Sequence, residues 1–91
     1  MSSIYKDIVI TNKLGLHARA AAKLTQLASS YQSEIYIARN DQRVNAKSIM
    51  GVMMLAAGLG VTVRVDADGP DAQEAIESIT KLFEENFNEP Q

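Results

Sequence analysis

The chain has 91 residues, a formal net charge of −2 and an isoelectric point near 5.2. This length fits one domain over residues 1–91, able to bury about 60–65% of its unfolded surface. A nucleic-acid-binding protein usually carries a basic stripe, and the lysines and arginines here are scattered. The absence of cysteine excludes disulfides and thiol catalysis, and one histidine leaves too few ligands for zinc.

The sequence also indicates the cellular compartment. Residues 1–7 lack the apolar run of a signal peptide, and no segment approaches the ~20 apolar residues of a membrane span. A chain without cysteine fits a reducing compartment. We therefore expect a cytoplasmic protein with no membrane insertion and no nucleic-acid partner.

The first third of the chain predicts a strand, a loop and a helix. Residues 4–10 are rich in β-branched side chains, which favour a strand. A loop over residues 11–16 leads into a helix from about residue 17 to residue 30. Its apolar face follows three- and four-residue spacing and consists of Ala20, Leu24, Leu27, Ala28 and Tyr31.

The middle third predicts a hairpin and a short helix. Residues 34–38 and 43–46 predict strands joined by a turn at residues 40–41, with Ile35 and Ile37 sharing one face. Ser48 is expected to be an N-cap, and the glycines of residues 58–60 are expected to end the helix. The apolar residues at helical spacing here are Ile49, Val52, Met53 and Ala56.

The last third predicts a strand and a long helix. Valines alternate with polar residues over residues 61–66, and Asp71 with Glu74 resembles a capping box at the start of the helix. Residues 88–91 are expected to fray. The predicted buried face consists of Ala72, Ala75, Ile76, Ile79, Leu82, Phe83 and Phe87. The order βαββαβα predicts a two-layer α/β sandwich with helices on one side of a four-stranded sheet.

The most informative segment contains the single histidine, His17, where the first loop becomes a helix. A helix N-terminus offers unpaired N–H groups and the positive end of the helix dipole, which favour a neutral imidazole and bind anions. Arg19 adds a planar set of donors suited to a phosphoryl group. A surface or capping role is the alternative for such a histidine, but the arrangement favours one that accepts and passes on a phosphoryl group.

Two segments, NKLGLHAR at residues 12–19 and VNAKSIMGVMML at residues 44–55, carry a resemblance to a known family. With the runs at residues 56–60 and 69–71, they make the chain similar to the HPr family. These are small histidine-containing phosphocarriers of the bacterial phosphotransferase system, and they include the nitrogen-branch members. The resemblance implies an open-faced β-sandwich with antiparallel strands in the order 1-4-2-3 and three helices on one face.

The same resemblance implies the chemistry. His17 would be phosphorylated on Nδ1 and Arg19 would stabilise the phosphoryl group. The donor would be enzyme I, itself phosphorylated by phosphoenolpyruvate, and the acceptor an enzyme IIA histidine, in sugar uptake or nitrogen and carbon regulation. Such a protein is a carrier rather than a free-standing enzyme, needs no metal or organic cofactor, and is expected to be a monomer. Family members commonly have proline where this chain has Ala20.

A second site is implied around residue 48. Methionines suit surfaces that accept several partners, so Ile49, Met50 and Met53 are expected to contact partners, with Lys47 facing acidic groups. Core packing is the alternative reading of these apolar residues. In Gram-positive-type members the serine that matches Ser48 is phosphorylated by an ATP-dependent HPr kinase, which makes that kinase/phosphorylase a further candidate partner.

Two other functions are consistent with parts of the sequence. A small hydrolase could use His17 with a serine and an aspartate, but the chain has no Gly-x-Ser-x-Gly motif and little room for a substrate pocket. A regulatory binding domain could keep the fold and use the phosphoryl group only as a signal, or not at all. Phosphoryl uptake from enzyme I separates the carrier from both.

Overall fold

The computed structural model describes residues 3–89, and none of its helices in that range is long and apolar enough to cross a bilayer. The chain alternates strands and helices as the sequence predicts. In chain order the elements are β1 (Ser3–Val9), α1 (Ala18–Ser29), β2 (Glu34–Arg39), β3 (Gln42–Asn45), α2 (Ile49–Met54), β4 (Thr62–Asp68), α3 (Ala72–Glu84) and the 3-10 helix η1 (Asn86–Asn88).

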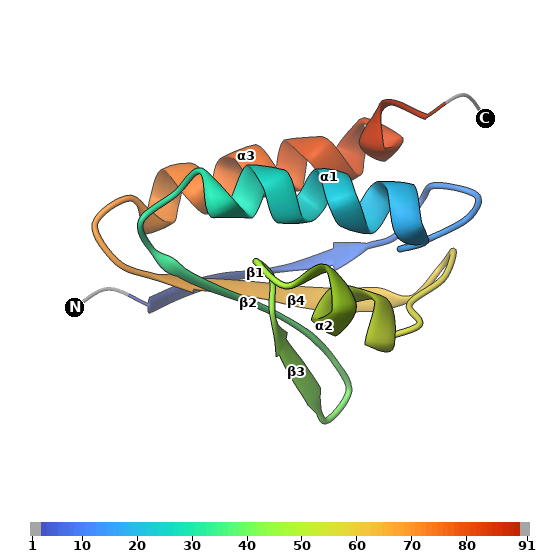
Figure 1. The fold of residues 1–91 in the computed structure, drawn as a ribbon, viewed down its shortest axis with the longest axis horizontal. Coiled ribbons are helices and arrows are strands. Elements are labelled where there is room, and N and C mark those ends of the chain that lie inside the picture. The colour runs from blue at the N-terminus through green and yellow to red at the C-terminus, as the bar shows by residue number, and fades with distance from the viewer. Residues whose placement is uncertain (1–2, 90–91) are drawn as a thin grey trace.

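The four strands form one antiparallel sheet in the order β1-β4-β2-β3, which confirms the predicted fold. Helices α1 and α3 lie side by side over one face of this sheet, and α2 packs against α1 and β3 (Figure 1). The opposite face has no helix among the described residues. The helices therefore leave one face of the sheet open.

The core lies between the sheet and the helices. Strand alternation sends Ile35 and Ile37 of β2 and Val63 and Val65 of β4 inward, all almost completely buried. The helices add their apolar faces. The predicted face of α3 is buried apart from the half-buried Leu82, but Phe87, predicted on the same helix, is buried beyond its end, in η1. The helical part of the core consists of Ala20, Ala21, Leu24, Ala28, Val52, Ala72, Ala75, Ile76, Ile79 and Phe83.

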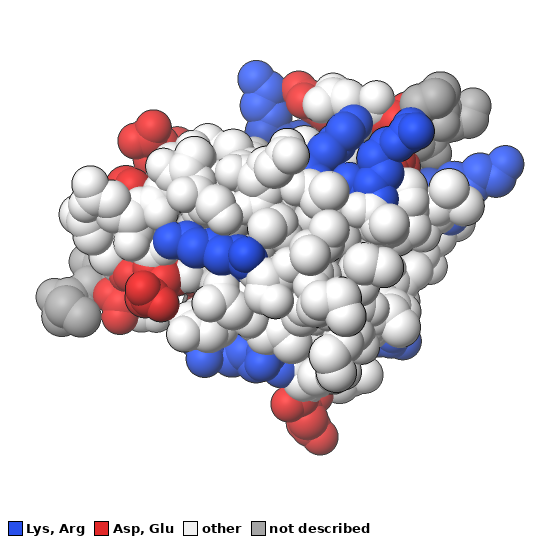
Figure 2. All heavy atoms as spheres, in the orientation of Figure 1, with Lys and Arg blue, Asp and Glu red and all other residues white. Residues whose placement is uncertain are grey.

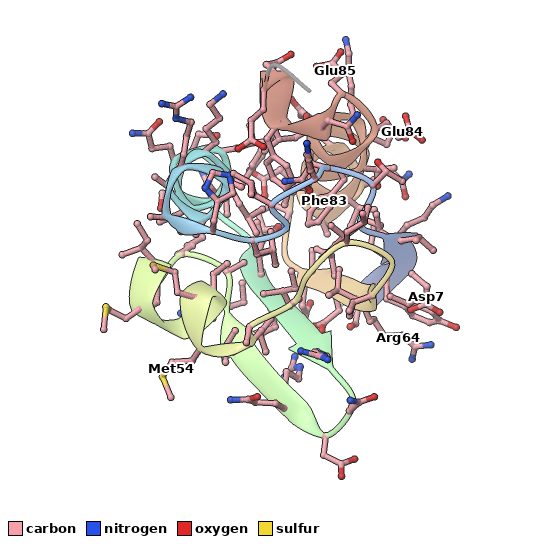
Figure 3. All side chains as sticks on the ribbon, turned by 90° about the vertical axis from the view of Figure 1, so that its right-hand side faces the viewer. Asp7, Met54, Arg64, Phe83, Glu84 and Glu85 are labelled. Atoms are coloured by element: carbon pink, nitrogen blue, oxygen red, sulfur yellow. The ribbon has the colours of Figure 1, made fainter. Side chains whose placement is uncertain are left out.

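The open face of the sheet pairs its own charges. Arg64 lies 4.0 Å above the centre of the Tyr5 ring, and its Nε and Nη2 groups donate to the Asp7 carboxylate, at 2.7 and 3.1 Å (Figure 3). These hydrogen bonds hold the pKa of Asp7 below its usual value. Arg43 makes the same two contacts: it lies over the Tyr36 ring and donates to the Asp66 carboxylate. Neither arginine is free to bind an anionic ligand.

The short helix α2 ends earlier than predicted. Its last residue is Met54, and Ala56 takes a left-handed conformation with φ 49°, so the glycines at residues 58–60 do not end it. The Arg39 guanidinium donates to the carbonyl oxygens of Leu55 and Ala56, at 3.1 and 2.8 Å. A distant arginine thus satisfies the last carbonyl groups, a contact that local sequence does not reveal.

The predicted capping box at α3 is wrong. Asp71 occupies the N-cap position, but its side chain makes no capping hydrogen bond. Its carboxylate instead accepts from the N–H groups of Gln32 and Ser33, both at 2.9 Å, and from the Ser33 hydroxyl at 2.6 Å. These bonds fasten the start of α3 to the loop between α1 and β2.

This contact predicts a pH-dependent contribution to stability. The Ser33 hydroxyl, and then the Gln32 N–H group, lower the pKa of Asp71, so the stabilisation is present at neutral pH and lost as the pH falls through the folded-state pKa. The variant Asp71→Asn should therefore melt at a lower temperature than the wild type at pH 7. That difference should shrink below about pH 4.

Thermal unfolding followed by circular dichroism, at a series of pH values, measures both effects. Asp41→Asn, a change in the exposed β2–β3 turn, is the matched control and should leave the melting temperature unchanged. A constant difference between Asp71→Asn and wild type across the whole pH range would contradict the assignment.

Candidate functional site

His17 lies at the N-cap of α1, as predicted. Its backbone is extended, with φ −75° and ψ −179°, and its carbonyl oxygen accepts from the Ala21 N–H group at 2.8 Å. The side chain makes no capping hydrogen bond, and 28% of it is exposed. The ring is therefore available for contacts other than capping.

A close backbone approach fixes the loop that carries His17. Gly15 has φ +65°, and a Cβ atom there would lie 2.5 Å from the carbonyl oxygen of Ala57 and 2.6 Å from Cα of Gly58. Next to it, the Leu16 N–H group donates to the Ala57 carbonyl oxygen at 2.9 Å, and the Leu16 side chain is buried. Only glycine fits this position, and it joins the histidine loop to the segment that follows α2.

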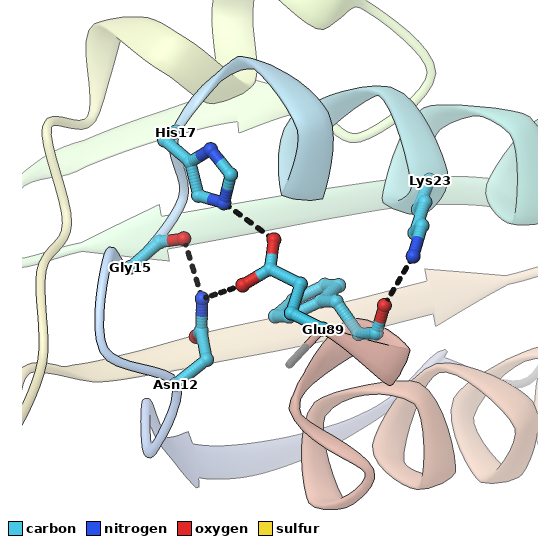
Figure 4. Close-up of polar contacts among 6 residues, drawn as sticks. Asn12, Gly15, His17, Lys23 and Glu89 are labelled. Atoms are coloured by element: carbon cyan, nitrogen blue, oxygen red, sulfur yellow. Dashed lines mark hydrogen bonds and ion pairs between the residues drawn. The ribbon is translucent and has the colours of Figure 1, made fainter. Parts of the chain in front are cut away.

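Two side chains, those of Asn12 and Glu89, form a network with the imidazole (Figure 4). The buried Asn12 amide donates to the Gly15 carbonyl oxygen at 2.8 Å and to Oε1 of Glu89 at 3.2 Å. The other carboxylate oxygen, Oε2 of Glu89, forms a hydrogen bond with Nε2 of His17. Because a carboxylate only accepts, Nε2 carries the proton. In the neutral form of the ring, the lone pair therefore lies on Nδ1, which points away from Glu89 in Figure 4.

The segment that delivers Glu89 is packed rather than frayed, which corrects the sequence-based expectation for residues 88 and 89. Phe87 is fully buried and meets the Phe83 ring at a centroid distance of 4.8 Å and an angle of 63°. Lys23 of α1 donates to the Phe87 carbonyl oxygen. Residues 86–88 all have positive φ, so the chain turns left-handed after α3. Residues 90–91, the rest of the expected frayed tail, lie outside the described residues.

The start of α1 also presents anion-binding groups. The regular helical hydrogen bonds begin at Ala21, so the N–H groups of residues 18–20 have no acceptor within the helix. Arg19 is exposed and forms no hydrogen bond or ion pair within the part of the chain that the structure describes. In Figure 2, lysine and arginine atoms gather over this end of α1 and the C-terminal segment. The charge and the free donors favour an anionic group beside His17.

An apolar surface covers α2, and we call it the methionine patch. Its four members, with their exposed fractions, are Ile49 (38%), Met50 (68%), Met53 (40%) and Met54 (65%). Met54, which projects outward in Figure 3, belongs to the apolar cluster seen in the sequence but was not among the residues predicted to contact partners. On the hidden side of the helix, Val52 and Leu55 are buried, as core packing requires.

The residues at the start of α2 are already engaged within the chain. Ser48 is the N-cap, as predicted, because its hydroxyl oxygen accepts from the Gly51 N–H group at 3.1 Å. Lys47 donates from Nζ to the carbonyl oxygen of Tyr31 at 2.8 Å, just beyond the C-terminal end of α1. Ser48 itself is exposed, whereas Lys47 is half-buried.

The family comparison agrees with this geometry. A family model described as the phosphorylation site of the PTS HPr component matches residues 4–85. The chain belongs to the HPr family of the phosphotransferase system. It is 56% identical over 86 residues to the phosphocarrier protein HPr of Cupriavidus necator, covering 94% of this chain and 97% of the relative. The phosphocarrier protein NPr of Shewanella violacea is 40% identical over 89 residues, or 98% of each chain.

Solved HPr structures have the same fold. A crystal structure of HPr-C-His from Thermoanaerobacter tengcongensis gives a TM-score of 0.91 at 43% identity, with all of both chains covered. A crystal structure of HPr from Bacillus anthracis gives a TM-score of 0.87 at 37% identity, and the match covers 91% of this chain and 99% of the B. anthracis chain. The HPr fold of this chain is therefore similar to experimental structures over nearly its whole length.

Within this HPr chain, two polar residues of the site were not identified from the sequence. Asn12 lies in the quoted NKLGLHAR segment, where its position two residues after the buried Ile10 was a weak signal that it turns inward. No local pattern in the sequence indicated that Glu89 contacts His17, because 72 positions separate the two residues. Only the left-handed turn at residues 86–88 brings it back to the histidine.

Proposed function

We propose that this HPr-type chain accepts a phosphoryl group on Nδ1 of His17 and passes it on in the cytoplasm. Phosphorylated enzyme I, ultimately supplied by phosphoenolpyruvate, is the proposed donor, and a histidine of an enzyme IIA is the proposed acceptor. The observation that supports this most directly is the state of His17: it stands at an uncapped helix N-terminus, partly exposed, with Nε2 hydrogen-bonded and Nδ1 facing away.

The transfer step follows from this tautomer. The lone pair of Nδ1 attacks phosphorus while the bond between phosphorus and the donor nitrogen breaks, and that nitrogen keeps the electron pair. Nε2 retains its proton, so the phosphorylated ring gains positive charge. In the second transfer, the bond between phosphorus and Nδ1 breaks as the acceptor nitrogen binds phosphorus, and the ring returns to its neutral form.

The surroundings of His17 suit the phosphoryl oxygens. The unpaired N–H groups of residues 18–20 and the positive end of α1 stabilise negative charge. Arg19 has no partner of its own among residues 3–89, so its guanidinium can reach the phosphoryl group without breaking an ion pair. No metal or organic cofactor is needed for this chemistry.

The methionine patch is the proposed contact surface for both partners. Its flexible, exposed side chains lie on α2, and the helix is followed by the segment that touches the His17 loop at Gly15. A partner that reaches the imidazole would therefore also cover Ile49, Met50 and Met53. Lys47 would add positive charge at the edge, although its Nζ already binds the end of α1.

The proposed function first predicts the behaviour of a His17 variant. His17→Ala should fold normally, because the ring contributes to the surface network and not to the core, and it should take up no phosphoryl group. Incubation with enzyme I, magnesium and labelled phosphoenolpyruvate measures uptake. In the wild type the bond should be labile in acid and stable in base, as expected for phosphohistidine. Uptake by His17→Ala at the wild-type level would contradict the assignment.

Arg19→Ala should slow transfer on the order of a hundredfold without abolishing it, because a positioned donor to the phosphoryl oxygens is lost while the nucleophile remains. Rapid-quench measurement of transfer from phosphorylated enzyme I checks this rate. Lys6→Ala, which removes an exposed positive charge from β1, is the matched control and should transfer at the wild-type rate. Equal rates for Arg19→Ala and wild type would remove Arg19 from the site.

Ser48 is proposed as a regulatory phosphorylation site for an HPr kinase, in addition to its capping role. A phosphate there carries a charge of about −1.5 to −2, which a helix N-terminus tolerates but an apolar docking surface does not. Ser48→Asp should keep the fold and raise the KM of enzyme I for this protein. Ser48→Ala should transfer normally and lose ~1 kcal/mol of stability, because the bond to the Gly51 N–H group is lost. An unchanged KM in Ser48→Asp would leave Ser48 as a cap alone.

A further inference from the structure

The C-terminal strap, residues 85–89, is held by contacts with α1, α3 and the histidine loop. Phe87 is fully buried against Phe83, and Lys23 donates to its carbonyl oxygen. The Thr11 hydroxyl donates to Oδ1 of Asn86 at 2.6 Å. These contacts anchor the strap before Glu89 is reached, so the position of the Glu89 carboxylate is set by the fold and not by its bond to His17 alone.

The Glu89 carboxylate is placed to act on one nitrogen of the ring. Only 7% of its side chain is exposed, so its interaction with Nε2 of His17 is largely shielded from water. Its second oxygen accepts from the Asn12 amide, which is also fastened to the Gly15 carbonyl oxygen. The Asn12 amide thus fixes the orientation of the Glu89 carboxylate. A carboxylate held in this way can in turn orient the histidine that it binds.

We propose that Glu89 is a positioning residue that holds the proton on Nε2 of His17 and stabilises the positive charge that the ring gains on phosphorylation. This inference rests on the proposed function of His17. As the bond between Nδ1 and phosphorus forms and the donor's bond breaks, the Nε2 proton stays in place and the ring becomes cationic. The carboxylate then faces a charged donor, and a charge-assisted hydrogen bond is stronger than a neutral one.

The two transfers should therefore depend on Glu89 differently. Acceptance from enzyme I creates charge on the ring, so the carboxylate lowers its barrier. Donation to an enzyme IIA removes that charge, so the loss of the carboxylate does not slow it. A purely structural role would affect both transfers alike, because both use the same loop and the same docking surface.

The first test needs no phosphoryl group. In ¹⁵N-labelled wild-type protein, the Nε2 proton of His17 should be protected from exchange with water and should give a resolved ring N–H signal. Glu89→Ala should lose this signal, since the ring nitrogen then meets solvent. Glu89→Gln offers a neutral oxygen on a side chain of the same shape and should keep it. Glu84→Gln, an exposed change at the end of α3, should leave the spectrum as in wild type.

The second test measures both transfers by rapid quench. Glu89→Ala should accept from phosphorylated enzyme I on the order of tenfold more slowly, the size expected for a group that orients a reactive side chain. Glu89→Gln should also accept more slowly, because its side chain carries no charge. Donation by the phosphorylated variants to an enzyme IIA should be at least as fast as in wild type. Glu84→Gln, which removes the same charge nearby, should match wild type in both directions.

The outcomes separate the two proposals. If wild type took up no phosphoryl group, the proposed function would fall and this role of Glu89 with it, whatever the spectra showed. If wild type accepted normally and Glu89→Ala accepted at the same rate, only the role of Glu89 would be overturned. Equal slowing of acceptance and donation, wild-type acceptance by Glu89→Gln, or an unchanged His17 spectrum in Glu89→Ala would each overturn it as well.

Discussion

The contact between the backbones of residues 15 and 57 is the constraint on which the site depends. At this point two loops touch with no side chain between them, and the positive φ of Gly15 makes the close approach possible. The hydrogen bond from Leu16 to Ala57 follows directly, and α1 begins two residues later. The position of the imidazole relative to α2 is therefore set by main-chain geometry, which is stiffer than contacts between exposed side chains.

The C-terminal segment holds the imidazole from a second side, through Glu89, and its left-handed backbone costs conformational free energy. Three successive residues in the left-handed region cost about 1–2 kcal/mol each for most side chains, less for asparagine. The sequence places Asn86 and Asn88 on either side of Phe87, so only the phenylalanine bears the full cost. Its complete burial contributes about 1.5–3 kcal/mol, enough to offset this. The carboxylate at His17 is thus held in place by an aromatic ring in the core.

The sequence predicted the elements because their signals are local. Alternation identified the inward residues of β2 and β4, and three- and four-residue spacing identified most of the buried faces of α1 and α3. The strand order came only from the resemblance to HPr proteins, since alternation does not say which strands pair. His17 was found because a lone histidine at a helix start is a local feature as well.

The errors all involve partners that are distant in the sequence. Arg39 at the end of α2, Ser33 beside Asp71 and Glu89 beside His17 lie 16, 38 and 72 positions from the groups they bind. Local pattern can propose that Asp71 caps its own helix, but it cannot reveal a better set of donors in another loop. The buried carboxylate beside His17 was therefore inaccessible from sequence, whereas His17 and Arg19 at the start of α1 were not.

The placement of His17 and the methionine patch on adjoining segments has a kinetic consequence. The ring is partly exposed, and the methionine patch lies on the helix whose following segment touches the His17 loop, so the proposed docking surface includes both. Under the proposed function, donor and acceptor would share this footprint and would therefore compete for it. Under that proposal, the donor has to leave before the acceptor can take the phosphoryl group. Under the same proposal, tight binding of either partner to this protein would slow transfer, so rapid transfer would require complexes that are weak and short-lived.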